Sequence, residues 1–192
     1  MHKCVLLCGV GGQGTVLASK LLQAAAEAKG IGVLSAETIG MAQRGGSVFS
    51  HLKMGDDIYS PLIGRSEADI ILGFEPGETV RMLPYLRKDG VVIVSKRPVM
   101  PVTAALMGSD YNGDAMIDYL KSKVDKVIVV DTDKAIEDLG SAKVLNIVLL
   151  GAALESGALD ITKDEIKEVI KKRVKPQFVE LNMRAIDYIK KE

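Results

Sequence analysis

The sequence is poor in aromatic residues and has no excess of charge of either sign. It lacks tryptophan, aromatic side chains make up only 4%, and 25 Lys plus Arg balance 25 Asp plus Glu. Proteins that bind nucleic acid usually present a basic face with stacking aromatic side chains, so we expect no nucleic-acid partner. No stretch approaches the roughly 20 apolar residues that cross a membrane, and Met1-His2-Lys3 lacks the apolar core of a secretory signal. We therefore expect a cytoplasmic protein with no membrane partner.

Cysteine is scarce too, because Cys4 and Cys8 are the only two. On an extended strand they would lie roughly 13 Å apart, which is too far for a disulfide. Two thiolates also cannot supply the ligand set of an iron–sulfur cluster. We predict that both are small buried side chains and that this chain holds no cluster.

Side chains for catalysis are missing at recognisable spacing. The sequence shows no nucleophile with a base, no paired acids and no cluster of metal ligands. His2, Cys4 and Cys8 cannot converge on one ion from a single extended strand. For His51, in a predicted strand, we favour a structural or interface role over proton transfer. We predict neither a catalytic residue nor a metal site on this chain.

What the sequence does contain is a regular alternation of strand and helix patterns. Its 192 residues, 47% apolar and 26% charged, suit one globular α/β domain spanning residues 1–192. Continuous apolar runs typical of buried parallel strands alternate with helical spacing. Strands are predicted at 4–8, 31–36, 47–53, 68–74, 91–95 and 126–130, and helices at 15–29, 77–87, 111–124, 141–155, 162–174 and after Pro176. We predict a three-layer α/β/α, Rossmann-like fold around a largely parallel sheet, with a mixed segment near residue 50.

Local signals place some boundaries more sharply. Thr162 and Glu165 have the spacing of a capping box, and Ile161 and Ile166 that of a hydrophobic staple. The run 88–90 ends in glycine and predicts a helix C-terminus there. The runs 58–63 and 131–139 are predicted as a short return segment and a short connecting segment.

The first glycine loop, Gly9-Val10-Gly11-Gly12-Gln13-Gly14, has the spacing G-x-G-x-x-G. It follows a predicted strand and opens a helix, whose N-terminal amides would form an anion site. Glu37 follows about where the ribose-binding acid of a dinucleotide fold would stand, so NAD binding is an open interpretation. Gln13 at the loop tip and a strand at 47–53 in place of a crossover helix weaken it.

A second glycine segment follows at Gln43-Arg44-Gly45-Gly46-Ser47. It pairs a forked cation with bare backbone, on which a phosphate, a carboxylate or another subunit's acid could rest. Alternatively, Arg44 bonds carbonyls of its own loop. If both segments lie at the carboxyl ends of neighbouring strands, they flank one crevice. The predicted cofactor-binding residues are Gly9, Gly11, Gly12, Gln13, Gly14, Gln43, Arg44, Gly45, Gly46 and Ser47.

These motifs together resemble a known family. The glycine loop and the run from Glu37 to Ile63 resemble the gamma-subunit family of the 2-oxoacid:ferredoxin oxidoreductases, as do Phe74-Glu75-Pro76, the run 146–151 and the run 178–182. The run 41–47 resembles the indolepyruvate branch. The resemblance implies the same α/β/α architecture.

The resemblance also implies a function. It implies a non-redox subunit, inactive alone, of an enzyme that oxidatively decarboxylates arylpyruvates to aryl-acetyl-CoA and reduces ferredoxin. Thiamine diphosphate and iron–sulfur clusters would lie on a large partner subunit, and coenzyme A would bind in the complex and not to this chain alone. Two alternatives stay open: an independent NAD-dependent oxidoreductase, and a purely scaffolding subunit with a vestigial nucleotide crevice.

Overall fold

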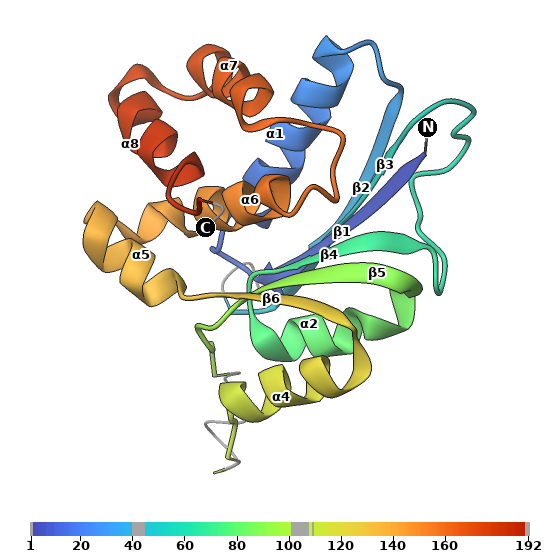
Figure 1. The fold of residues 1–192 in the computed structure, drawn as a ribbon, viewed down its shortest axis with the longest axis vertical. Helices are drawn as coiled ribbons and strands as arrows, with labels where there is room; N and C mark the ends of the chain where they lie inside the picture. The colour runs from blue at the N-terminus through green and yellow to red at the C-terminus, as the bar shows by residue number, and fades with distance from the viewer. Residues whose placement is uncertain (1, 40–44, 101–107, 109, 191–192) are drawn as a thin grey trace.

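The structure, a computed structural model, describes residues 2–39, 45–100, 108 and 110–190. Within them one mixed sheet has the strand order β2-β3-β1-β4-β5-β6 (Figure 1). The strands are β1 (Lys3–Val10), β2 (Val33–Ile39), β3 (Ser47–Met54), β4 (Ala68–Gly73), β5 (Leu86–Ser95) and β6 (Lys126–Val130). Strand β3 is antiparallel to both of its neighbours, β1 and β2, and the β1–β4, β4–β5 and β5–β6 pairs are parallel. The mixed segment predicted near residue 50 is therefore β3.

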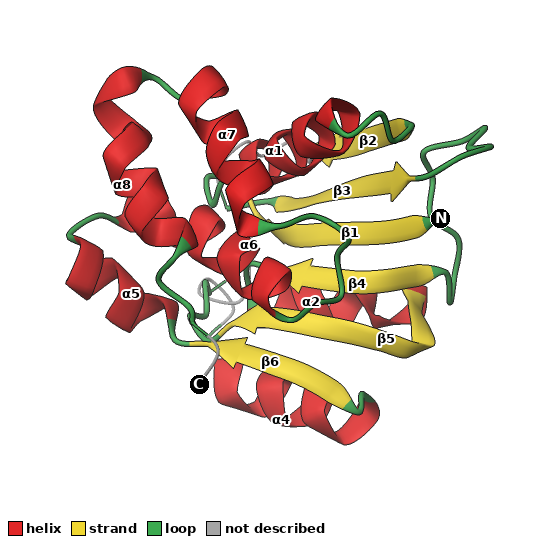
Figure 2. Cartoon of the chain, turned by 45° about the horizontal axis from the view of Figure 1, so that its top comes forward, coloured by secondary structure: helices red, strands yellow, loops and turns green. Residues whose placement is uncertain are grey.

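Helices cover both faces of this sheet, which confirms the predicted three layers. Figure 2 shows α2 and α4 on one face and α1 and α6 on the other, where α5, α7 and α8 pack as well. The helices are α1 (Thr15–Ala28), α2 (Pro76–Met82), α4 (Gly113–Lys123), α5 (Thr132–Leu139), α6 (Leu145–Glu155), α7 (Lys163–Arg173) and α8 (Pro176–Ile186). No helix among the described residues is long and apolar enough to cross a membrane.

The core lies where the apolar runs predicted it. Strand β1 is central, and the side chains from Cys4 to Cys8 are at most 2% exposed. Both cysteines are free thiols, and burial raises the pKa of each. Helix α6 is apolar nearly all round and is buried along almost its whole length, because it packs between the sheet and α8.

The capping box at the start of α7 is confirmed. The amide of Glu165 donates to Thr162 Oγ1 at 3.2 Å, and the amide of Thr162 donates to Glu165 Oε2 at 2.8 Å. Ile161 and Ile166, the predicted staple, are both buried in the core on this face of the sheet.

Four predicted elements differ in the structure. Helix α2 ends at Met82, since Pro84 follows within a 3-10 turn (Leu83–Tyr85), and residues 88–90 belong to β5 instead of a helix end. The run 131–139 is mostly the helix α5, with Asp131 accepting from the amide of Lys134 and Gly140 closing it in the left-handed conformation. Residues 58–63 form no strand, and α6 begins at Leu145 after a 3-10 turn at Ala142–Val144.

Candidate functional site

The two glycine segments meet at the carboxyl edge of β1, where β3 begins. The amide of Gly11 donates to the carbonyl of Gly46 at 2.8 Å, and the amide of Gly45 donates to the carbonyl of Gly11 at 3.4 Å. Next to this contact, Val10 of β1 pairs with Ser47 of β3. The expected neighbourhood is therefore present for the described part of the second segment. Gln43 and Arg44 lie outside the described residues.

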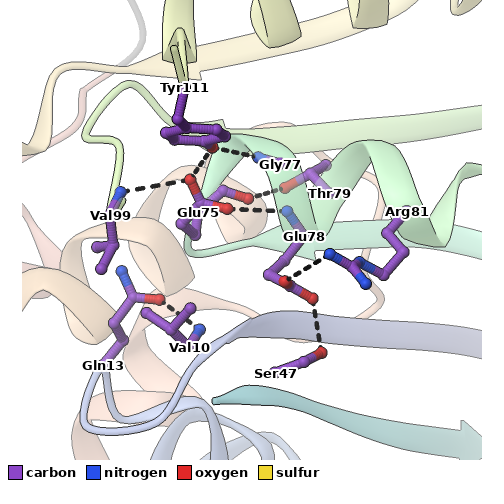
Figure 3. A network of polar contacts seen from close by, with 10 residues as sticks. All are labelled: Val10, Gln13, Ser47, Glu75, Gly77, Glu78, Thr79, Arg81, Val99 and Tyr111. Carbon is purple, nitrogen blue, oxygen red and sulfur yellow. Dashed lines mark hydrogen bonds and ion pairs between the residues drawn. The ribbon is translucent and has the colours of Figure 1, made fainter. Parts of the chain in front are cut away.

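Gln13 closes the first loop internally and points inward. Its Oε1 accepts from the amide of Val10 at 2.8 Å (Figure 3). Its Nε2 donates to the carbonyl of Phe74 at 2.9 Å. A Cβ at Gly9 would lie 2.6 Å from Gln13 Oε1 and 2.7 Å from Phe74 Cβ. Glycine at this position therefore leaves room for the two hydrogen bonds of Gln13. Gly9 and Gln13, predicted as cofactor-binding residues, are engaged within the protein.

Gly12 and Gly14 hold the loop in a shape that needs glycine. Gly12 is exposed, has φ +102° and would find no atom within 4 Å of an added Cβ, so the space in front of it is open. Gly14 has φ +83°, and its Cβ would lie 2.7 Å from Asn146 Nδ2 of α6. Gly12 is thus the part of the loop that a ligand could approach.

The start of α1 is unlike most helix starts in the described residues. Gly14 is its N-cap, no side chain caps it, and its first turn holds no acid. Ala18 donates to the carbonyl of Gly14, so the amides that precede Ala18 in the first turn have no partner within the helix. Such amides favour an anion, so the anion site that the glycine spacing predicts stays a prediction at this helix start.

The neighbouring helix α2 starts at a buried carboxylate from the motif Phe74-Glu75-Pro76, which the sequence analysis did not include among the predicted site residues. Glu75, 2% exposed, is its N-cap and accepts from the amide of Glu78 at 2.8 Å. Its other oxygen accepts from the hydroxyl of Tyr111 and, at 3.4 Å, from the amide of Val99 (Figure 3). The acid directly before Pro76 at the end of β4 was the available signal for this cap.

Tyr111 joins two segments of the carboxyl edge. Its hydroxyl donates to Glu75 and accepts from the amide of Gly77 at 2.9 Å. Burial, followed by the hydrogen bond to Glu75, raises the pKa of Tyr111 well above its ordinary value. Tyr111 therefore stays protonated and holds the segment after β5 against α2. It also lines, with Lys96, Asn112 and Asp131, a cavity of about 710 Å³ over the ends of β5 and β6, to which neither glycine segment contributes.

Two positions considered from the sequence lie away from this edge. Glu37 is on β2, and β3 stands between β2 and β1 in the sheet. In a dinucleotide fold the acid's strand would lie next to β1, so the expected place of Glu37 is wrong. His51 lies within β3, where its Nδ1 accepts from the amide of Ile63 at 3.1 Å and its ring stands edge-on to Phe49 and Tyr85.

Among the described residues, no three His, Cys, Asp or Glu side chains are placed to hold a metal ion. The described edge of this three-layer α/β domain carries the two joined glycine segments, at the carboxyl ends of strands where ligands usually bind in such sheets. Residues 4–191 match the family described as pyruvate ferredoxin/flavodoxin oxidoreductase. The chain belongs to that family.

Individual proteins of this family are similar to the chain over nearly its whole length. Indolepyruvate oxidoreductase subunit IorB of Thermococcus kodakarensis is 35% identical over 188 residues, which cover 95% of this chain and 92% of that protein. The subunit of the same name from Archaeoglobus fulgidus is 33% identical, with 97% and 92% covered. The pyruvate/ketoisovalerate oxidoreductases common subunit gamma of Thermococcus kodakarensis is 27% identical, with 93% and 90% covered. The resemblance to the gamma-subunit family is confirmed.

Solved structures share the fold. Pyruvate oxidoreductase subunit PORC from Thermotoga maritima has a TM-score of 0.70 at 22% identity, with 97% of this chain and 94% of that chain covered. The 2-oxoglutarate:ferredoxin oxidoreductase from Magnetococcus marinus, solved with 2-oxoglutarate, coenzyme A and succinyl-CoA bound, has a TM-score of 0.72 at 16% identity. The match covers 97% of this chain but 30% of that longer chain.

Proposed function

We propose that this chain is the small, non-redox subunit of an indolepyruvate:ferredoxin oxidoreductase. The complete enzyme would oxidatively decarboxylate arylpyruvates to aryl-acetyl-CoA and reduce ferredoxin. The observation that carries the proposal is the group of relatives named IorB, which are 30% to 35% identical over 95% to 97% of this chain. Residues 1–192 would form one gamma-type domain.

The chemistry requires a partner. Decarboxylation and electron transfer would be supplied by thiamine diphosphate and iron–sulfur clusters on a large partner subunit. The free cysteines of this chain are both buried, and burial raises the pKa of their thiols, so neither suits cluster ligation. The chain's own contribution would be to complete the assembly and to form part of the coenzyme A region.

The described residues fit an anionic group at the start of α1. Gly12 is open to approach, and the first-turn amides of α1 have neither an N-capping side chain nor an acid beside them. A phosphate group of coenzyme A would suit these donors. Gln43 and Arg44 stay predicted members of the same site, with Arg44 supplying the cation.

A direct test is to co-express this chain with its large partner and assay the complex. Arylpyruvate-dependent reduction of ferredoxin should require coenzyme A, the large subunit and this chain together. Pyruvate and 2-oxoglutarate are the matched control substrates. Equal or higher turnover of either control would contradict the indolepyruvate assignment, and full activity of the large subunit alone would contradict a role for this chain.

A second candidate is a purely scaffolding subunit whose crevice binds no nucleotide. It is favoured by the bonds between Gly11 and the second glycine segment, which use backbone groups that a ligand would otherwise meet. The third interpretation, an independent NAD-dependent oxidoreductase, loses its main support because β3 separates Glu37 from the glycine loop.

Calorimetry separates these three. A dinucleotide enzyme should bind NADH as the isolated chain. The proposed subunit should bind coenzyme A only in the complex, and that binding should weaken in Arg44→Ala while the isolated fold stays stable. A scaffold should bind neither ligand in either form.

A further inference from the structure

Glu78, in the first turn of α2, is a buried carboxylate with few partners. The residue is 7% exposed. Its Oε2 accepts from the hydroxyl of Ser47 at 2.6 Å, and its Oε1 lies 3.5 Å from Nη2 of Arg81, whose side chain is 66% exposed. Burying a carboxylate costs free energy unless it is well bonded. The short bond to Ser47 is therefore the principal interaction of a group that is expensive to bury.

Ser47 is the point where the second glycine segment enters the sheet. It opens β3 and pairs with Val10 of β1. The residue before it, Gly46, accepts the amide of Gly11. A bond that fixes the Ser47 side chain therefore fixes the end of the second glycine segment beside the first glycine loop.

The backbone of Glu78 is itself held by a hydrogen bond at the start of α2. Its amide donates to Oε2 of Glu75, and Glu75 accepts from the hydroxyl of Tyr111 and the amide of Val99. Figure 3 shows this chain of bonds running from the segment after β5, through the start of α2, to Ser47. The segments lie far apart in sequence, so only these contacts bring them together.

We propose that Glu78 is a positioning residue that sets the described end of the second glycine segment, residues 45–47, against the first through Ser47. A charge-assisted bond suits this role because it is shorter and stronger than a neutral one. The ligand-related part rests on the proposed function: if coenzyme A meets the two glycine segments, loosening Ser47 weakens coenzyme A binding without altering the arylpyruvate site.

The first test needs no assumption about function. Amide hydrogen exchange in the full chain reports the bond from Gly11 to Gly46, because opening that contact exposes the Gly11 amide. Exchange at Gly11 should be faster in Ser47→Ala and in Glu78→Ala, and Ser47→Thr, which keeps the hydroxyl, should restore the wild-type rate. Tyr188→Phe is the control, since it removes another bond to a carboxylate, that of Asp138, from the opposite face of the sheet. Unchanged exchange at Gly11 in Ser47→Ala overturns the positioning role.

The second test uses the assembled enzyme. Ser47→Ala should raise the Michaelis constant for coenzyme A on the order of 10-fold, as expected for the loss of a hydrogen bond to a charged group. The Michaelis constant for arylpyruvate should stay within about 2-fold. Ser47→Thr should restore the wild-type Michaelis constant for coenzyme A. Ser47→Ala combined with Glu78→Ala should be no worse than Ser47→Ala alone, because both substitutions remove the same hydrogen bond.

The outcomes distinguish the two ideas. Faster exchange with an unchanged Michaelis constant for coenzyme A in an active complex overturns the ligand-related part. A wild-type complex that shows no coenzyme A-dependent activity overturns the proposed function instead, and the exchange result then decides the positioning role by itself.

Discussion

The starts of α1 and α2 lie side by side at the carboxyl edge, after the paired parallel strands β1 and β4. Helix α1 starts at a glycine with no capping side chain, and Gly12 in front of it is open to solvent. Helix α2 starts at Glu75, whose buried carboxylate fills the same position and is bonded on both oxygens. Both places favour negative charge. The start of α2 is already filled by the protein's own carboxylate, whereas the start of α1 has no acid in its first turn, and we propose that it meets the anion of a ligand.

The largest effect should come from removing the Glu75 carboxylate at the start of α2. Glu75→Ala leaves the amides of Glu78 and Val99 and the hydroxyl of Tyr111 without an acceptor. We expect a loss of about 2 to 4 kcal/mol in the free energy of unfolding, combining a lost cap with buried unpaired donors. Urea unfolding of the isolated chain measures it. Asp131→Ala, which removes the exposed cap of α5, is the control, and an equal loss in both would show that burial of Glu75 adds nothing.

The next effect tests the start of α1, where Gly12 is open to solvent. Gly12→Val places a β-branched side chain at φ +102° and in front of the amides of α1. The strained backbone should cost roughly 1 to 3 kcal/mol, and coenzyme A-dependent activity of the complex should fall further than stability explains. Gly45→Val, at φ +75°, should act in the same direction. Gly157→Val has a similar φ of +71° at the C-terminal end of α6 and is the control, which should lose stability but keep its affinity for coenzyme A.

A smaller effect concerns His51, which lies within β3 and away from the carboxyl edge. Burial, then the charge of Lys53, lowers the pKa of His51 below its ordinary value of 6.5. A lowered folded-state pKa means that the unfolded chain binds the proton first, so stability is complete above about pH 6.5 and is lost as the pH falls. Protonation also removes the lone pair that accepts the amide of Ile63.

The measurement is the free energy of unfolding between pH 8 and pH 5. His51→Gln should flatten the decrease, whereas His2→Gln should leave it as in the wild type. The groups facing His51 are Phe49, Lys53 and Tyr85, together with the amide of Ile63. A decrease that persists unchanged in His51→Gln would place the titrating group elsewhere.

The smallest effect should come from adding a carboxylate at the start of α1, so that it resembles the start of α2. Leu17 is 42% exposed in the first turn of α1, and Leu17→Glu adds a carboxylate there. Thermal unfolding should show a gain of about 0.3 to 1 kcal/mol from the helix dipole. The Michaelis constant for coenzyme A in the complex should nevertheless rise. Leu17→Gln is the neutral control, and identical Michaelis constants in the two variants would mean that no anion binds at this end of α1.

Much of the fold is determined by short-range patterns. The continuous apolar run at Cys4–Cys8 can only be buried on both faces, so it predicted the central strand. The capping box of Thr162 and Glu165 satisfies its donors within four residues, and it occurs as predicted. The glycine spacing likewise predicted the loop before α1, because glycine adopts the positive φ of Gly12 and Gly14 without steric cost.

The sequence alone also determined the family, since the glycine motifs and later runs extend over nearly the whole chain. It could not determine the order of the strands. That β3 stands between β1 and β2, and so moves Glu37 away from the glycine loop, depends on pairing between strands that are distant in sequence.

Only the tertiary structure decided how the carboxyl edge is held. Glu75 meets Tyr111 across 36 positions, and Ser47 meets Glu78 across 31. No local periodicity encodes such pairs, because each acid could equally well have faced solvent in a helix turn. The packing of α2 against the sheet buries both carboxylates, and a buried carboxylate must find donors wherever the fold places them.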